Sequence, residues 1–207
     1  MNREEKNMLT RQQIIKSAIA EFGMNSYAEA SLNTICKDGN ISKGIIYHYF
    51  KDKDELYLVC VTECFKRLTT FLNREKITFN QVEQDIEKYL ELRQQFFEDN
   101  PGFGNIFTNA LLQPPKHLVE QIKEIKTELD NYNVNFYEQI LKNVKLRNDI
   151  THDEAIEYFL LFQESFNHYF QNRTYGDYRK LFDEHELKLS KFLNIMFHGM
   201  VQEEREC

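Results

Sequence analysis

The sequence is poor in residues that interrupt regular secondary structure. It contains 7 glycines and 3 prolines among 207 residues, and it has no tryptophan. This is far below average usage, which disfavours collagen-like, linker-rich and turn-dense all-β proteins. Hydrophobic residues make up 42% of the chain and aromatic residues 14%, enough to form a buried core. The composition therefore favours long helices around an aromatic-rich interior.

Long hydrophobic runs and an excess of basic residues are missing as well. Apolar runs are short, as in Tyr158–Phe162, whereas a membrane span needs about 20 residues, and the polar N-terminus lacks the apolar segment of a secretory signal. The net charge of −7 argues against a protein that coats nucleic acid without sequence preference. The cysteines are few: Cys36, Cys60, Cys64 and Cys207. We therefore expect a reduced, cytoplasmic protein without membrane contact.

Charge is distributed unevenly along the chain. Residues 1–56 carry 8 basic and 8 acidic side chains, whereas residues 57–207 carry 18 basic and 25 acidic ones. All of the negative excess therefore lies in the C-terminal part. This split is typical of a small DNA-reading segment joined to an acidic body.

Apolar residues recur at helical spacing along the whole sequence, which predicts an all-α fold. The first helix is expected from Thr10, as N-cap with Gln13 in a capping box, to about Gly23. Further helices are expected at about 31–37, 42–50 and 54–72, with a tight turn at Gly39-Asn40. Beyond residue 80 the expected helices cover about 81–98, 103–112, 116–145, 149 or 151 to 172, and 182–201, with a polar connection over 173–180.

The two short helices around the Gly39-Asn40 turn have the arrangement of a helix-turn-helix motif, whose second helix enters the DNA major groove. That helix begins at Ser42, and Gly44 removes side-chain bulk where the backbone would approach DNA. Helical spacing places Ile46 and Phe50 in the core and Tyr47 at the surface. The expected DNA-binding residues are Ser42, Lys43, Gly44, Ile45, Tyr47, His48, Tyr49 and Lys53.

The segment Ile35–Leu56, ICKDGNISKGIIYHYFKDKDEL, resembles the signature of the TetR family of bacterial transcriptional regulators, and Ile15, Ala18 and Phe22 fit that family's first helix. The resemblance implies a two-fold homodimer in which a helix-turn-helix domain, residues 1–56, precedes a helical ligand-binding and dimerisation domain, residues 57–207. It also implies a repressor that leaves its operator when a small molecule binds. Ile45 departs from the usual threonine, which removes a hydroxyl contact and suits a thymine methyl group.

The resemblance assigns roles position by position. Tyr47 would contact phosphate, and Lys53 would hold the DNA backbone. The residues that would face bases are Lys43, Gly44, Ile45 and His48. Tyr49 occupies a position that is also often in contact with DNA.

Several side chains outside this motif have a functional and a structural interpretation. Cys60 and Cys64 share a helix face, and we expect buried structural thiols there rather than metal ligands or a redox sensor. Glu164 and His168 form another such pair, which suits a metal or acid-base site but is more typical of a polar notch in a pocket or dimer seam. The remaining histidines, His117, His152, His185 and His198, are expected at the surface or at caps.

Aromatic and aliphatic residues of the C-terminal part supply the remaining candidates. An apolar or aromatic effector with one polar group is expected between helices, and its candidate contacts are Phe103, Phe107, Phe136, Tyr137, Phe162 and Phe166. The last two helices carry more apolar surface than one internal contact needs, which predicts a dimer interface at Leu160, Leu161, Phe170, Leu189, Phe192, Leu193, Met196 and Phe197. No cofactor or metal is expected. Two rivals remain open: a helical enzyme using Glu164 and His168, and an adaptor acting through protein contacts of the C-terminal domain.

Overall fold

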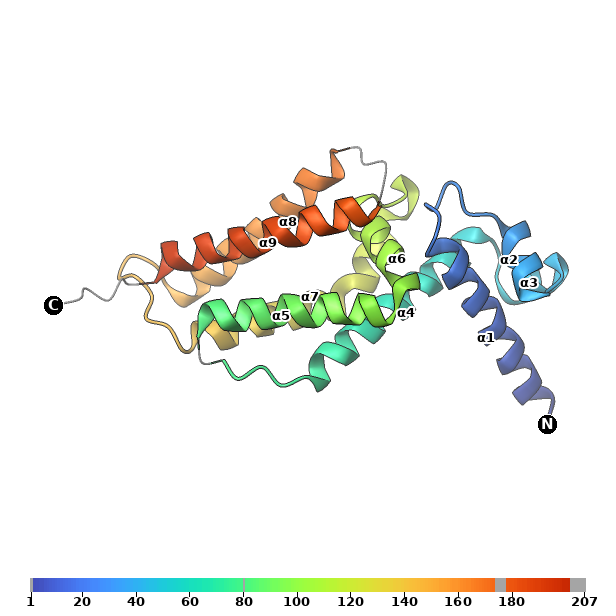
Figure 1. Ribbon diagram of the computed structural model, residues 1–207, viewed down its shortest axis with the longest axis horizontal. Coiled ribbons are helices and arrows are strands. Elements are labelled where there is room, and N and C mark those ends of the chain that lie inside the picture. The colour runs from blue at the N-terminus through green and yellow to red at the C-terminus, as the bar shows by residue number, and fades with distance from the viewer. Residues whose placement is uncertain (1, 80, 174–177, 202–207) are drawn as a thin grey trace. The chain divides into compact units, whose positions relative to one another are not determined.

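The computed structural model describes residues 2–79, 81–173 and 178–201, and this part of the chain holds nine α-helices, one 3-10 helix and no β-sheet (Figure 1). The predicted all-α class is confirmed. The elements are α1 Arg3–Phe22, α2 Leu32–Gly39, α3 Lys43–Tyr49, α4 Lys53–Arg74, α5 Val82–Asp99, α6 Pro101–Leu112, η1 Lys116–Leu118, α7 Val119–Leu141, α8 His152–Gln171 and α9 Tyr178–Met200.

The chain packs into two compact units, each of which consists of two separate stretches of sequence. Unit 1 consists of Met1–Arg67 and Phe97–Lys126, and unit 2 consists of Leu68–Phe96 and Thr127–Cys207. The predicted boundary after residue 56 falls within α4, which continues without a break. The division of roles between 1–56 and 57–207 therefore stays a prediction about function, while packing groups α6 with the N-terminal helices.

The first helix begins about two turns earlier than its sequence pattern suggested. Asn2 is the N-cap of α1, its side chain accepts a hydrogen bond from the Glu5 amide at 2.7 Å, and the Glu5 carboxylate accepts one from the Asn2 amide at 2.9 Å. The expected start at Thr10 is wrong, because Thr10 lies inside the helix and its hydroxyl donates to the Lys6 carbonyl. Both Asn2-x-x-Glu5 and Thr10-x-x-Gln13 have the spacing of a capping box, and in the structure the first of them begins the helix.

The core of unit 1 joins α1 to the motif helices and to α6. Ile14, Ala18 and Phe22 are buried on one face of α1, and Ile46 and Phe50 are buried at α3. At the end of α1, a Cβ atom on Gly23 would meet the Gly102 carbonyl oxygen at 2.6 Å. Glycine is therefore needed where α1 meets α6, and this contact holds α6 against the N-terminal helices.

Unit 2 has an aromatic core drawn from α5, α7, α8 and α9. Tyr89 stacks on Phe136 with ring centroids 4.7 Å apart, and Tyr137 stacks on Phe197 at 5.7 Å. Thr151 caps α8 through a capping box with Glu154, one of the two starts expected from the sequence. Helix α7 ends at Leu141 rather than near Lys145, and α9 begins at Tyr178, inside the expected polar connection, of which residues 174–177 lie outside the described part.

Candidate functional site

The helix-turn-helix has the turn that its sequence indicates. Asn40 takes the left-handed conformation, with φ 49° and ψ 46°, directly after α2. Gly39 is still helical, and a Cβ atom there would meet the Ser17 hydroxyl at 2.7 Å, so Gly39 is needed for close packing rather than for backbone freedom. Ser42 caps α3 by accepting a hydrogen bond from the Ile45 amide at 3.3 Å.

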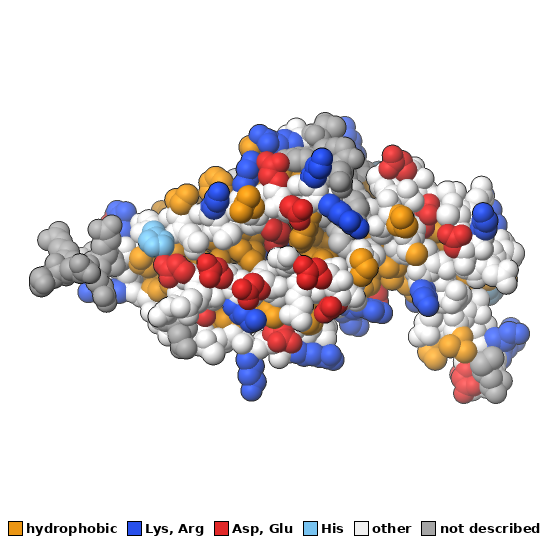
Figure 2. All heavy atoms as spheres, in the orientation of Figure 1, with side chains coloured by type: hydrophobic (Ala, Val, Ile, Leu, Met, Phe, Trp, Pro, Cys, Tyr) orange, Lys and Arg blue, Asp and Glu red, His pale blue; other side chains and the backbone are white. Residues whose placement is uncertain are grey.

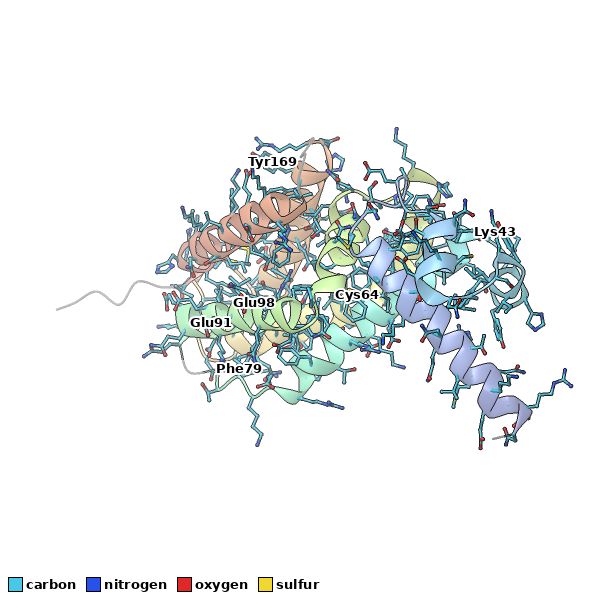
Figure 3. The ribbon with its side chains drawn as sticks, turned by 45° about the vertical axis from the view of Figure 1, so that its right-hand side comes forward. Lys43, Cys64, Phe79, Glu91, Glu98 and Tyr169 are labelled. Atoms are coloured by element: carbon cyan, nitrogen blue, oxygen red, sulfur yellow. The ribbon has the colours of Figure 1, made fainter. Side chains whose placement is uncertain are left out.

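The outer face of α3 is exposed and contains no carboxylate. Its exposed side chains belong to Lys43, Gly44, Ile45, Tyr47 and His48. Tyr47 is 49% exposed and Ile45 is 41% exposed, whereas Ile46 and Phe50 are 1% exposed, as predicted. Lys43 projects from the first turn of the helix (Figure 3). This face offers one cationic group, two polar ring tips and one aliphatic side chain to a partner.

Tyr49 differs from its neighbours because its hydroxyl already has a partner in the protein. It is half-buried, and its hydroxyl donates to Asn7 Oδ1 of α1 at 3.2 Å. The His48 ring packs edge-on against it, with centroids 5.1 Å apart. The end of α3 is thereby attached to the first turns of α1.

Lys53, at the start of α4, lies in a cluster that the sequence did not reveal. Its amino group lies 4.5 Å from the centre of the Tyr27 ring, and the Tyr27 hydroxyl donates to Asp54. The other Asp54 oxygen is 3.2 Å from Nε2 of His117, which lies in η1. The Tyr27 hydrogen bond, helped by His117 and opposed by burial, holds the pKa of Asp54 below its usual value. Nothing in the spacing relates His117 to the motif, because 63 residues separate it from Asp54.

The six aromatic residues expected to contact an effector do not form one group. Phe103 and Phe107 are buried in unit 1, where the Phe107 ring packs against Phe65 and Phe97. The other four lie in unit 2 as two pairs, Phe136 with Tyr137 at 5.4 Å and Phe162 with Phe166 at 5.4 Å. Their role in ligand binding stays a prediction.

A buried ionic network crosses unit 2 and was missed at the sequence level. Arg93 of α5 is 4% exposed, and its guanidinium donates to Glu186 at 2.9 Å and to the Tyr89 hydroxyl at 3.0 Å. Tyr89 in turn donates to Asn133 at 2.7 Å. The signal in the sequence was an arginine at helical spacing from Ile86, Tyr89 and Phe96, which form the buried face of α5.

His185 belongs to the same network, and its expected surface position is wrong. It is 2% exposed, with Nδ1 2.9 Å from Glu186 and Nε2 3.1 Å from Asn167. Burial opposes ionisation of Glu186, but Arg93 and His185 outweigh burial and hold the pKa of that carboxyl below its usual value. The carboxylate is therefore charged within the interior of unit 2.

The eight residues expected at a dimer interface divide into two groups. Phe170, Leu189, Leu193 and Phe197 are buried within unit 2, and Met196 is half-buried. The exposed members are Leu160, Leu161 and Phe192, and other large apolar side chains of α8 and α9 are exposed with them: Tyr158, Tyr169, Leu187 and Ile195. An apolar surface thus exists on both helices, although half of the expected residues serve the core.

The remaining candidates from the sequence are the cysteines and the Glu164–His168 pair. Cys60 and Cys64 are buried as expected, burial raises the pKa of both thiols, and Cys64 Sγ lies 3.7 Å from the Phe103 carbonyl. Cys207 lies outside the described residues. Glu164 and His168 are both exposed, and the His168 ring contacts Asn172 at 3.0 Å. Across the described ranges, no three His, Cys, Asp or Glu side chains gather as a metal site would require.

Acidic side chains gather elsewhere. Figure 2 shows a series of them over the face on which α5 lies, and the exposed ones in unit 2 include Glu83, Glu87 and Glu91. No helix among the described residues has the length and apolar character to cross a membrane.

Comparisons with known proteins match this geometry. Residues 14–60 match the family model described as bacterial regulatory proteins, tetR family. The chain is 26% identical over 163 residues to the biofilm operon icaADBC HTH-type negative transcriptional regulator IcaR of Staphylococcus epidermidis, covering 75% of this chain and 80% of that protein.

Solved structures share the fold over nearly the whole chain. A TetR family transcriptional regulator from Chloroflexus aurantiacus has a TM-score of 0.58 at 22% identity, covering 95% of each chain. The transcriptional regulator FadR from Bacillus subtilis in complex with stearoyl-CoA has a TM-score of 0.57 at 16% identity, covering 88% of this chain and 97% of that one. Residues 14–60 thus match the tetR family of bacterial regulatory proteins, and the solved structures show that the chain shares the fold of TetR family regulators.

Proposed function

We propose that this protein is a repressor that binds double-stranded operator DNA as a homodimer and leaves it when a small effector binds. The observation that carries the proposal is the exposed, carboxylate-free outer face of α3. The similarity to IcaR, a negative transcriptional regulator, supports repression. Because the proposed partner is chromosomal DNA, the protein is proposed to act in the cytoplasm and without catalysing a reaction.

The side chains of α3 divide by what they can recognise. Lys43 is long and cationic and is proposed to donate to a guanine edge in the major groove. Ile45 suits a thymine methyl group, and Gly44 lets the backbone approach the DNA. Tyr47 and Lys53 are proposed to contact phosphates, which fix position but carry no sequence information.

Dimerisation supplies the second recognition helix. The exposed apolar side chains of α8 and α9 are proposed to pack against the same helices of a second chain in a two-fold bundle. Two copies of α3 would then occupy successive major grooves, about 34–36 Å apart.

The effector is proposed to be apolar or aromatic with one polar group, bound among the aromatic side chains of the helical domain. The likeness in fold to a FadR that binds stearoyl-CoA supports a ligand-regulated mechanism. The ligand would favour a dimer whose recognition helices no longer match the groove spacing. It releases DNA only by its difference in affinity for the two conformations.

The deciding experiment measures binding of purified protein to the intergenic DNA upstream of its own gene and to scrambled DNA, at two salt concentrations. We expect selective binding to the first DNA, and we expect Tyr47→Ala to weaken binding to both. A protein that binds both DNAs equally, or a genome-wide fragment selection that recovers no preferred site, would overturn the proposal.

A further inference from the structure

We propose that the first turns of α1, residues 3–11, are a second DNA-contact element that holds backbone phosphates beside the site read by α3. This inference rests on the proposed DNA-binding function. Helix α1 begins at Arg3, whereas the match to the family model begins at residue 14. The matched region therefore does not account for these turns.

The extension is attached to the recognition helix by two contacts within unit 1. Asn7 Oδ1 accepts the hydrogen bond from the Tyr49 hydroxyl at 3.2 Å. One turn further on, the Arg11 guanidinium lies 5.3 Å from the centre of the Phe50 ring. Both contacts are made at the C-terminal end of α3, directly after the exposed Tyr47 and His48. The surface of α3 therefore continues onto α1.

Two of the three side chains on the attached face are basic, and the first turn also carries the exposed Glu4. Arg3, Asn7 and Arg11 are four residues apart and lie on one face of the helix, above the buried Ile14. Among the described residues, neither Arg3 nor Arg11 forms an ion pair with a carboxylate. Glu5 points elsewhere, because its carboxylate closes the capping box with Asn2.

The chemistry of this face favours phosphates over bases. Two guanidinium groups about 12 Å apart along a helix can each donate to phosphate oxygens, and that length matches the rise of three to four nucleotides of one strand, at about 3.4 Å each. A short row of this kind contributes salt-dependent affinity without sequence preference. The occupant we assign to it is therefore the sugar-phosphate backbone of the same duplex.

The test compares charge removal on opposite faces of one helix. Arg3→Gln and Arg11→Gln remove the proposed contacts, and Lys16→Gln removes one positive charge from an exposed position nine residues beyond Asn7, on the opposite face of the helix. Dissociation constants are measured on operator and scrambled DNA over a range of salt concentrations. Each arginine variant is expected to weaken binding to both DNAs by about fivefold to tenfold per lost contact near 0.1 M salt, and to reduce the salt slope by about 1 per contact. Lys16→Gln is expected to keep the wild-type slope.

A second pair of variants tests the attachment. Asn7→Ala and Tyr49→Phe both remove the hydrogen bond between α1 and α3, and both are expected to lower affinity by the same factor. Thermal unfolding checks that each variant is folded, and Arg3→Gln is the safest one because Arg3 lies in the first turn of the helix. The inference is overturned if both arginine variants match Lys16→Gln while Tyr47→Ala still weakens binding. If the wild-type protein shows no selective binding, the proposed function fails, and this inference fails with it.

Discussion

The two units differ in whether their main polar side chains are exposed or buried. In unit 1 the candidate functional groups are exposed on α3, over a core of aliphatic and aromatic side chains. In unit 2 the main polar cluster, built on Arg93 and Glu186, is buried among aromatic rings. The same kinds of side chain therefore serve recognition in one unit and internal structure in the other.

This contrast predicts where substitutions act. Lys43 and Tyr47 are exposed on α3, so their removal is expected to change DNA affinity while the free energy of unfolding stays within about 0.5 kcal/mol. Removal of one member of the buried ion pair in unit 2 is expected to lower the free energy of unfolding instead, because the other charge stays buried and loses its ionic partner. The following predictions test this separation.

The largest effect is expected for Glu186→Leu. This change removes the carboxylate that compensates the buried Arg93 guanidinium, and the free energy of unfolding is expected to fall by about 3–5 kcal/mol. Urea unfolding at one fixed protein concentration measures it, since a dimer's stability depends on concentration.

The matched control is the double variant Arg93→Met/Glu186→Leu. Replacing both charges with apolar side chains is expected to recover most of the loss, because no buried charge remains. A double variant that is as unstable as Glu186→Leu alone would mean that packing, rather than charge compensation, explains the effect.

Two glycines of unit 1 test the same separation of stability from DNA affinity by the addition of a single methyl group. In Gly23→Ala the added Cβ would meet backbone atoms of Gly102, so unfolding free energy is expected to fall by about 1–3 kcal/mol. In Gly44→Ala the Cβ meets nothing within 4 Å, and helix propensity favours alanine by up to about 1 kcal/mol.

The variant that is expected to be the more stable of the two is expected to bind operator DNA more weakly. Gly44→Ala is expected to lower operator affinity because the methyl group occupies the space where the backbone approaches DNA, whereas folded Gly23→Ala keeps its affinity. Thermal unfolding and a DNA titration on the same samples give both quantities. Unchanged operator affinity in Gly44→Ala would show that the backbone at Gly44 does not approach the DNA closely.

Lys43→Ala tests whether the exposed face reads sequence. Loss of a base contact is expected to lower the ratio of operator to scrambled affinity by about 1–3 kcal/mol for each recognition helix, with unfolding unchanged. Tyr47→Ala, in comparison, should weaken binding to both DNAs alike. Equal losses on the two DNAs for Lys43→Ala would make it a phosphate contact.

What could be predicted from the sequence follows the same division. The recognition helix was predictable because its cap, its buried residues and its exposed residues all lie between Ser42 and Phe50 and follow helical spacing. The Arg93–Glu186 pair was not, because 93 residues separate its members and only tertiary packing joins them. The start of α1 was missed for a local reason, since two capping boxes lie in series and the pattern of apolar residues begins only at Ile14.

The smallest effect is expected at the border of the DNA-binding surface, for Tyr27→Phe. The Tyr27 hydroxyl donates to Asp54 and lowers the pKa of that carboxyl, so the bond stabilises the folded state above the usual pKa of an aspartate and is lost as the pH falls through the lowered value. Asp54 is partly exposed, and solvent screening limits the contribution to below about 1 kcal/mol. The difference in unfolding free energy between wild type and Tyr27→Phe should therefore be present at pH 7 and should diminish as the pH falls through the lowered pKa of Asp54. A difference that stays constant over this pH range would show that the ionised carboxylate is not the acceptor that matters, and that Tyr27 acts through the packing of its ring against Tyr57 and Lys53.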